Sequence, residues 1–145
     1  MVKPERTGER DMSLSERHRL YGIDCPAVDI DLLLIEYDSA TPVALIEYKN
    51  EHSFSGNTSW STWRALETLA NNAMLPLFKV TYSSDFSRWC VRPVNYIAQY
   101  RIPQPVEMDE PDFVRFLYSL RGREVPPEVW ENIRKAKREV VSDAQ

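Results

Sequence analysis

Two acidic side chains and a lysine occur together in two neighbouring apolar segments of the sequence. Asp31 lies in the first segment, residues 27–37, while Glu47 and Lys49 end the second, residues 43–49. Carboxylate oxygens are good ligands for hard cations such as Mg²⁺ and Mn²⁺. A nearby ammonium group can orient a water molecule or offset developing negative charge. These residue types therefore predict a metal-dependent hydrolytic site.

The two segments are expected to form a β-hairpin. Both are rich in β-branched and apolar residues, and turn-forming residues fill positions 38–42 between them. A register that begins with Tyr37 opposite Val43 places Leu33 opposite Glu47. The same register places Asp31 opposite Lys49, and opposed Cβ atoms lie about 5 Å apart. The charged side chains are therefore expected to converge on one point.

Side-chain alternation predicts which residues share a face of this hairpin. One face carries Asp29, Asp31, Glu47 and Lys49 together with several apolar residues, and the other face is apolar almost throughout. Because both faces are largely apolar, the sheet is expected to be covered on both sides. Charges on a covered face are costly unless they are paired, hydrated or bound to a cation. The alternative interpretation is a cross-strand salt bridge between Asp31 and Lys49, with Glu47 solvated.

This pattern, an Asp on one strand followed by Glu-x-Lys on the next, resembles the PD-(D/E)xK nuclease superfamily. That superfamily includes restriction endonucleases, archaeal Holliday-junction resolvases and phage nucleases. The resemblance covers about the first two thirds of the chain and implies an α/β fold with a central mixed β-sheet flanked by helices. It also implies Mg²⁺- or Mn²⁺-dependent hydrolysis of DNA phosphodiester bonds by a metal-activated water. Small single-domain relatives are common in phages, which suggests a phage or other mobile element as the source.

The resemblance also implies roles for individual residues. Asp31 and Glu47 would be metal ligands, the main-chain carbonyl of Tyr48 a further ligand, and Lys49 the catalytic lysine. Asp29 is an alternative to Asp31, and the choice between them is left open. Superfamily members often carry an acidic residue on a preceding helix, where Glu16 is the candidate. The alternative role of Glu16 is a capping box at residues 13–16.

Composition predicts an ordinary globular protein. The 145 residues suit a single domain, with C-terminal helices from about 109 to 141. The chain is 43% apolar and 28% charged, and no apolar run is long enough to span a membrane. The two cysteines are too few for a disulfide framework, and the charged N-terminal segment is unlike a signal peptide. An intracellular, cytoplasmic location is therefore expected.

A net charge of −4 is unusual for a protein that binds DNA. Carboxylates at a metal site add to the acidic count without repelling DNA once a dication is bound. The candidate DNA contacts are Arg17 and Arg19, with Arg6 and Arg10 nearby, and Arg64 on the helix after the hairpin. A C-terminal basic group, Arg134, Lys135, Lys137 and Arg138, is interpreted as a solvated helix face.

The remaining segments predict further helices and strands. Residues 59–74 have the spacing of an amphipathic helix, with Trp60 and Trp63 on its apolar side. Strands are expected at 77–82 and 86–91, and helices at 13–20, 111–121 and 127–141. His18 and His52 are the only histidines, and a loop position without a catalytic role is the simpler interpretation of His52. The polar loop 50–59 is expected to lie over the site.

The expected function is a DNA nuclease. The alternatives are a non-catalytic DNA-binding or assembly protein that retains the nuclease fold, and an α/β interaction module with a structural Asp31–Lys49 pair. A single site cuts one strand, so a homodimer would provide the second site that a duplex or a junction requires.

Overall fold

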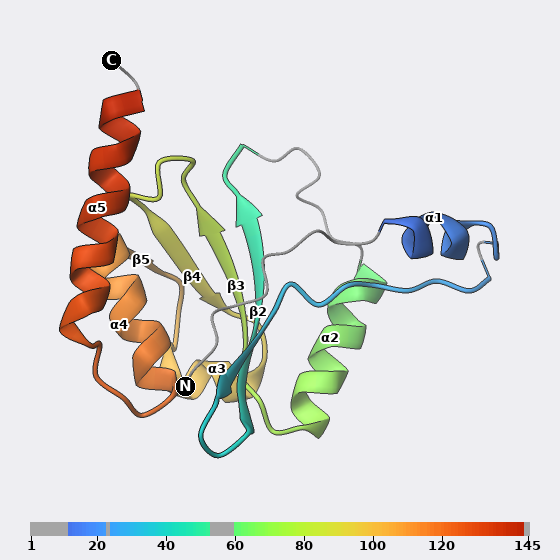
Figure 1. Cartoon of the computed structure of the whole chain (residues 1–145). Coiled ribbons are helices and arrows are strands. Elements are labelled where there is room, and N and C mark those ends of the chain that lie inside the picture. Colours follow the sequence, from blue (N-terminus) through green and yellow to red (C-terminus); the bar gives the residue numbers. More distant parts are fainter. Residues whose placement is uncertain (1–11, 23, 53–59, 144–145) are drawn as a thin grey trace.

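The structure of the protein is a computed structural model that describes residues 12–22, 24–52 and 60–143, the side chains of 140–143 excepted. Within these ranges five strands form one mixed sheet that is flanked by helices (Figure 1). The strands are β1 (Leu32–Glu36), β2 (Thr41–Asn50), β3 (Leu77–Tyr82), β4 (Trp89–Pro93) and β5 (Val106–Met108). The helices are α1 (Ser13–Arg19), α2 (Trp60–Asn72), α3 (Tyr96–Arg101), α4 (Glu110–Leu120) and α5 (Pro127–Asp143). This confirms the predicted α/β class with a central mixed sheet.

The sheet has the simple strand order β1-β2-β3-β4-β5. Only β2 and β3 are parallel, and the other neighbours are antiparallel. Parallel neighbours need a crossover connection, and α2 supplies it between β2 and β3. The predicted hairpin and the predicted β3 are both present, whereas α3 and β5 lie in segments where no element was predicted.

The core has two parts, one on each face of the sheet. On one face, Ile46, Phe78 and Val80 pack with Phe113 and Leu120 of α4. On the other, Leu45 and Leu77 pack against Leu66 and Ala70 of α2. Alternation along β2 therefore sends Ile46 towards α4 and Leu45 towards α2.

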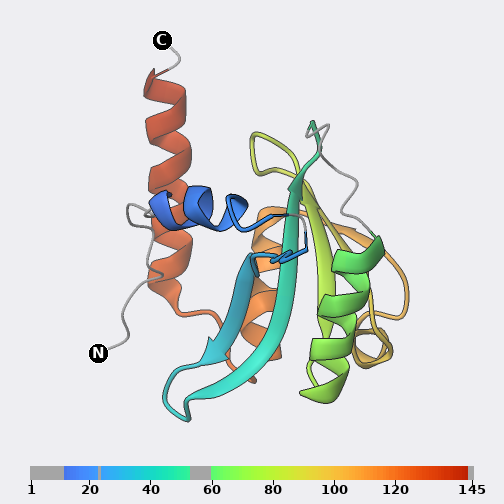
Figure 2. The same ribbon diagram turned by 90° about the vertical axis from the view of Figure 1, so that its right-hand side faces the viewer.

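The expectation that both faces of the hairpin are covered is wrong for β1. Leu33 is 48% exposed and Ile35 is 41% exposed, on the face of β1 that points to the α2 side. A helix with its side chains is about 10–12 Å wide, little more than two strand spacings. Since α2 packs on β2 and β3, it leaves β1 outside its cover (Figure 2).

The predicted register of the hairpin is also wrong. Leu33 pairs with Leu45 rather than with Glu47, and the chain turns early enough for Glu36 to pair with Thr41. The turn is tight because Ala40 adopts a positive φ of 52°. A β-bulge between Leu34 and Ile35 then shifts the pairing. The displacement near the site is two residues, so Asp31, Glu47 and Lys49 keep their predicted face while their partners change.

Several predicted boundaries move for local reasons. β1 begins at Leu32 rather than at residue 27, and β4 begins at Trp89 rather than at residue 86. Phe86 has a positive φ of 61°, and the Asp85 carboxylate accepts hydrogen bonds from the backbone and hydroxyl of Ser87. These contacts extend the β3–β4 turn and delay the start of β4.

The helix starts differ in how they are capped. Met12 precedes α1 and no side chain caps it, so the expected Ser13–Glu16 capping box is absent. Asp109 caps α4, and its carboxylate accepts from the N–H of Asp112 at 2.8 Å. Asn95 caps α3 and is 1% exposed. Its carbonyl accepts from the N–H groups of Ala98 and Leu77, so this one amide joins α3 to β3.

The apolar side chains of α5 are only partly covered. Val129 and Ile133 are half-buried, but Ala136 is exposed along with the rest of 134–139. Figure 1 shows the C-terminal half of α5 extending past α4. In this part of α5 the basic residues are exposed, as expected, and Ala136 is exposed with them.

Candidate metal centre

Asp31 and Glu47 face each other where the β1–β2 ladder ends. The Asp31 N–H donates to Oε1 of Glu47 at 3.2 Å, and the Tyr48 N–H donates to Oδ2 of Asp31 at 3.0 Å. Since backbone pairing of β1 stops at Leu32, these two carboxylates accept the N–H groups that the ladder leaves over. The reciprocal bonds hold the carboxyl groups of both strands at one point. The observed register thus pairs Asp31 with Glu47, and not with Lys49 as predicted.

Burial sets the electrostatics of the pair. Glu47 is buried, with 6% of its surface exposed, whereas Asp31 is exposed. Burial raises the pKa of Glu47, the Asp31 N–H opposes this, and the Asp31 carboxylate raises it again. A buried carboxyl group beside a second carboxylate favours either a proton or a bound cation. The Asp31–Glu47 pair therefore attracts a proton or a cation.

Lys49 lies two residues beyond Glu47 on the same face of β2. Its positive charge lowers the pKa of Glu47, against the effect of burial. Among the described residues no ion pair joins Lys49 to Asp31, so the simple cross-strand salt bridge is not formed.

The donor set suits a magnesium ion in its usual protein environment. Mg²⁺ commonly takes one or two carboxylates and keeps several waters, and Asp31, Glu47 and the Tyr48 carbonyl could supply such a set. In the described part of the chain, no three His, Cys, Asp or Glu side chains come together as a metal-binding group. A site here would therefore consist of two carboxylates completed by a main-chain oxygen and water.

The other predicted ligands lie elsewhere. Asp29 lines a hollow with His18 and Arg19, next to α1. Glu16 lines a second hollow on α1 with Arg17 and Leu20. Asp31 is the candidate that accepts a hydrogen bond from the Tyr48 N–H, directly beside Glu47 on β2.

The predicted DNA contacts occupy two helices on the α2 side of the molecule. Arg17 and Arg19 belong to α1, which lies on the α2 side of the sheet in Figure 1 but is well separated from α2, towards the β1 edge, in Figure 2. Arg64 forms an ion pair with Glu67 at 3.5 Å, and its guanidinium lies 5.9 Å from the ring centre of Trp60. Of the two tryptophans on the predicted apolar side of α2, Trp63 packs against the core, whereas Trp60 is 75% exposed.

The histidines have local partners. Nε2 of His18 lies 2.7 Å from the carbonyl of Cys25, and Nε2 of His52 lies 3.3 Å from Glu51. The imidazole of His52 is 75% exposed, which agrees with a loop position. Arg6, Arg10 and most of the loop 50–59 lie outside the described residues.

Two cations near Glu47 were missed by the sequence analysis. Glu47 pairs with Lys79 on β3, and Lys79 pairs with Arg92 on β4. Paired residues on neighbouring strands point to the same face, so both cations share the face of Glu47. Single basic residues in apolar strands carry no sequence signal of their own, and only the register brings them beside the carboxylates.

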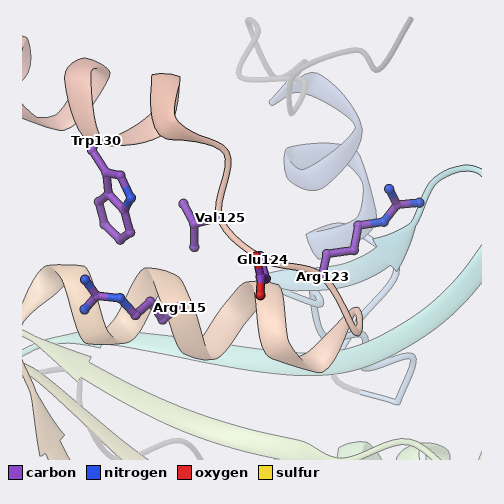
Figure 3. Close-up of a pocket in the computed structure, with 5 residues that line it drawn as sticks. All are labelled: Arg115, Arg123, Glu124, Val125 and Trp130. Carbon is purple, nitrogen blue, oxygen red and sulfur yellow. The ribbon is translucent and has the colours of Figure 1, made fainter.

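A separate pocket of about 380 Å³ lies between α4 and α5 (Figure 3). Arg115 and Trp130 stand opposite each other across it, with the guanidinium carbon 4.8 Å from the ring centre. Val125 and Glu124 lie beside them, and no member of the carboxylate pair reaches this pocket. Its contacts serve to pack α5 on α4.

Comparisons with protein-family models, with curated proteins and with solved structures found no match to this chain. Among the described residues, every helix is too short or too polar to cross a membrane.

Proposed function

We propose that this protein is a metal-dependent nuclease that hydrolyses DNA phosphodiester bonds. The observation that carries the proposal is the meeting of the buried Glu47 carboxyl group with Asp31 at the end of the hairpin, beside Lys49. The expected Mg²⁺ or Mn²⁺ would polarise a phosphoryl oxygen and lower the pKa of water. Both described cysteines are free thiols, in keeping with a protein that works in a reducing, intracellular setting.

Each residue has a definite task in this proposal. Asp31 and Glu47 offer the anionic oxygens that bind the cation, and their backbone hydrogen bonds hold both groups in place. The Tyr48 carbonyl adds a neutral oxygen at the same strand end. Lys49 holds the attacking water or offsets the charge that develops on the phosphate.

The rival function is a non-catalytic DNA-binding or assembly protein. It is favoured by the same hydrogen bonds, because the two carboxylates also complete the β1–β2 ladder and could be retained for structure alone. In that case DNA binding would persist without hydrolysis.

Cleavage assays separate these functions. The full chain is incubated with plasmid, linear and branched DNA in Mg²⁺, Mn²⁺ or EDTA. Metal-dependent cleavage is expected, and Asp31→Asn, Glu47→Gln and Lys49→Ala should each lower the rate by about a hundredfold or more. Asp29→Asn should retain activity, which would decide between the two Asp residues.

Glu128→Gln and Lys135→Ala are matched controls, because both remove a charge from exposed positions on α5. They should cut at the parental rate. Absence of cleavage on every substrate and metal, or parental rates in all three site variants, would reject the nuclease proposal. Binding without cleavage would favour the non-catalytic protein.

A further inference from the structure

A row of charged residues crosses three strands on the α2 side of the sheet. Glu47, Lys79 and Arg92 are successive partners on β2, β3 and β4. Neighbouring strands are about 4.8 Å apart, which places the two cations one and two strand spacings from the position of Glu47. The next row on this face begins with Lys49, whose partner on β3 is Thr81. The basic side chains therefore extend from the carboxylate pair in one direction.

The charges of Lys79 and Arg92 are not neutralised by the protein itself. Neither residue forms an ion pair within the part of the chain that the structure describes, and the same holds for Arg17, Arg19, Arg101 and Arg138, whereas six other arginines there do. Arg64, Arg88, Arg115, Arg121, Arg123 and Arg134 each have a carboxylate within 4.0 Å. Lys79 is half-buried and Arg92 is exposed. Two unpaired cations beside a buried acid form a surface suited to an anion that approaches from solvent.

The opposite side of the carboxylate pair is apolar. The β1 residues on the same face are Leu33 and Ile35, and both are partly exposed. A polyanion that has one phosphate at the Asp31–Glu47 pair would therefore find positive charge over β3 and β4 and none on β1. This asymmetry predicts a direction for the bound chain.

We propose that Lys79 and Arg92 bind the phosphates next to the scissile one, so that a DNA strand runs from the carboxylate pair across β3 and β4. This inference rests on the proposed nuclease function, because the carboxylate pair marks the scissile phosphate. In this proposal the residues of the β2–β3–β4 row contact the phosphate backbone of the DNA. Such contacts position the substrate but do not read its sequence. The exposed side chains of β1 take no part in binding the strand.

The test compares two double variants of equal charge. Lys79→Gln/Arg92→Gln removes the row, and Arg101→Gln/Lys135→Gln removes two exposed cations from α3 and α5. Fluorescence anisotropy measures binding of a labelled single strand and of its duplex in EDTA, over a range of salt concentrations. Loss of two phosphate contacts should reduce the salt slope by about 1.4 for the single strand and about 1.8 for the duplex. Affinity at low salt should fall by about tenfold or more, while the control keeps the parental slope and affinity.

Two controls distinguish the loss of charge from a loss of folding. Circular dichroism checks that the row variant is folded, and Lys79→Arg/Arg92→Lys, which retains both charges, should restore the salt slope. In cleavage assays the row variant should raise KM and leave the Mg²⁺ concentration for half-maximal activity unchanged. Equal slopes in row and control variants, or no DNA binding by the parent, would overturn the inference. Binding with the expected slope change but no cleavage would support the row and reject the nuclease function.

Discussion

At the scale of single residues, Glu47 determines the character of the candidate site. It is a carboxylic acid in a core strand, it is 6% exposed, and the Asp31 carboxylate next to it raises its pKa. Burial is the largest cause of its raised pKa, and the Asp31 N–H and Lys49 only partly oppose it. The folded protein therefore holds this proton more tightly than the unfolded chain does. A divalent cation would relieve the same electrostatic penalty.

The first prediction concerns Glu47→Gln in the absence of metal. Because the folded-state pKa is raised, Glu47 contributes stability below its ordinary value of 4.5, and this contribution is lost as pH rises through the folded pKa. Glutamine has nearly the same shape and no charge, so the variant should be more stable than the parent at pH 8. The difference should shrink towards pH 4. Urea unfolding in EDTA across this pH range measures it.

Metal addition and a second variant serve as the controls. Saturating Mg²⁺ at one hundred times its Kd should stabilise the parent by about 2.7 kcal/mol, and the Glu47→Gln variant less. Glu128→Gln, which changes an exposed glutamate, should follow the parent at every pH. A stability difference between Glu47→Gln and the parent that does not vary with pH would contradict the argument.

At the scale of elements, the β1–β2 hairpin brings the two carboxylates together but receives helix cover on one face only. Leu34 packs against the core beneath α4, whereas Leu33 points to the side that α2 does not reach. Adjacent residues of one strand therefore lie in different environments. The tight turn and the bulge set the pairing that makes Asp31 the neighbour of Glu47.

The second prediction compares Leu33→Ala with Leu34→Ala. The two substitutions remove the same atoms from neighbouring positions of β1. Leu34→Ala should destabilise the protein by about 2–3 kcal/mol because it opens space in the core, and Leu33→Ala by less than about 1 kcal/mol. Urea denaturation measures both, each variant being the control for the other. Equal losses would mean that a partner covers the outer face of β1.

At the scale of the whole molecule, an ionic contact joins β1 to the connection between α4 and α5. Arg123 donates two hydrogen bonds to Glu36, each at 2.7 Å, and one to Asp38 at 2.7 Å. Arg121 approaches the same Glu36 carboxylate at 3.4 Å. The contact connects segments that are 87 residues apart in the sequence. The contact holds the end of β1 that is farther from the site, and Asp31 directly precedes the other end of the same strand.

The third prediction concerns Arg123→Gln. The hydrogen bonds from Arg123 are the largest cause of the lowered pKa of Glu36. A lowered pKa means that the contact contributes stability above the ordinary value of 4.5, and that this contribution is lost as pH falls through the folded pKa. The variant should therefore be less stable than the parent at pH 7 and should lose less stability on acidification. Thermal unfolding between pH 7 and pH 3 measures this.

Arg134→Gln is the matched control, because it breaks an exposed pair with Glu131 on α5. Its unfolding temperature should follow the parent as pH falls, since surface pairs within one helix contribute little. Parallel curves for Arg123→Gln and the parent would show that the Glu36 contact does not stabilise the fold.

Local patterns in the sequence were sufficient for the class of fold and for the alternation within each strand. Alternation depends only on the backbone of one strand, so Glu47 and Lys49 could be assigned to one face of β2 without a structure. Asp31 kept its predicted place on that face because the register moved by an even number of residues. The β2–α2–β3 unit and the α4 start near Pro111 likewise follow from periodicity and local signals. These features need no knowledge of distant residues.

Only the tertiary structure decided which residues are partners. The turn at Ala40 and the bulge moved the register by two residues, which replaced Asp31–Lys49 with Asp31–Glu47. The width of α2 determined that Leu33 stays exposed, and the pairing of β2, β3 and β4 placed Lys79 and Arg92 beside Glu47. Such contacts depend on small differences in turn geometry and on packing between distant segments. A sequence pattern records which side chains of one strand share a face, but the offset between strands, and with it the pairs of residues that meet, arises only when the chain folds.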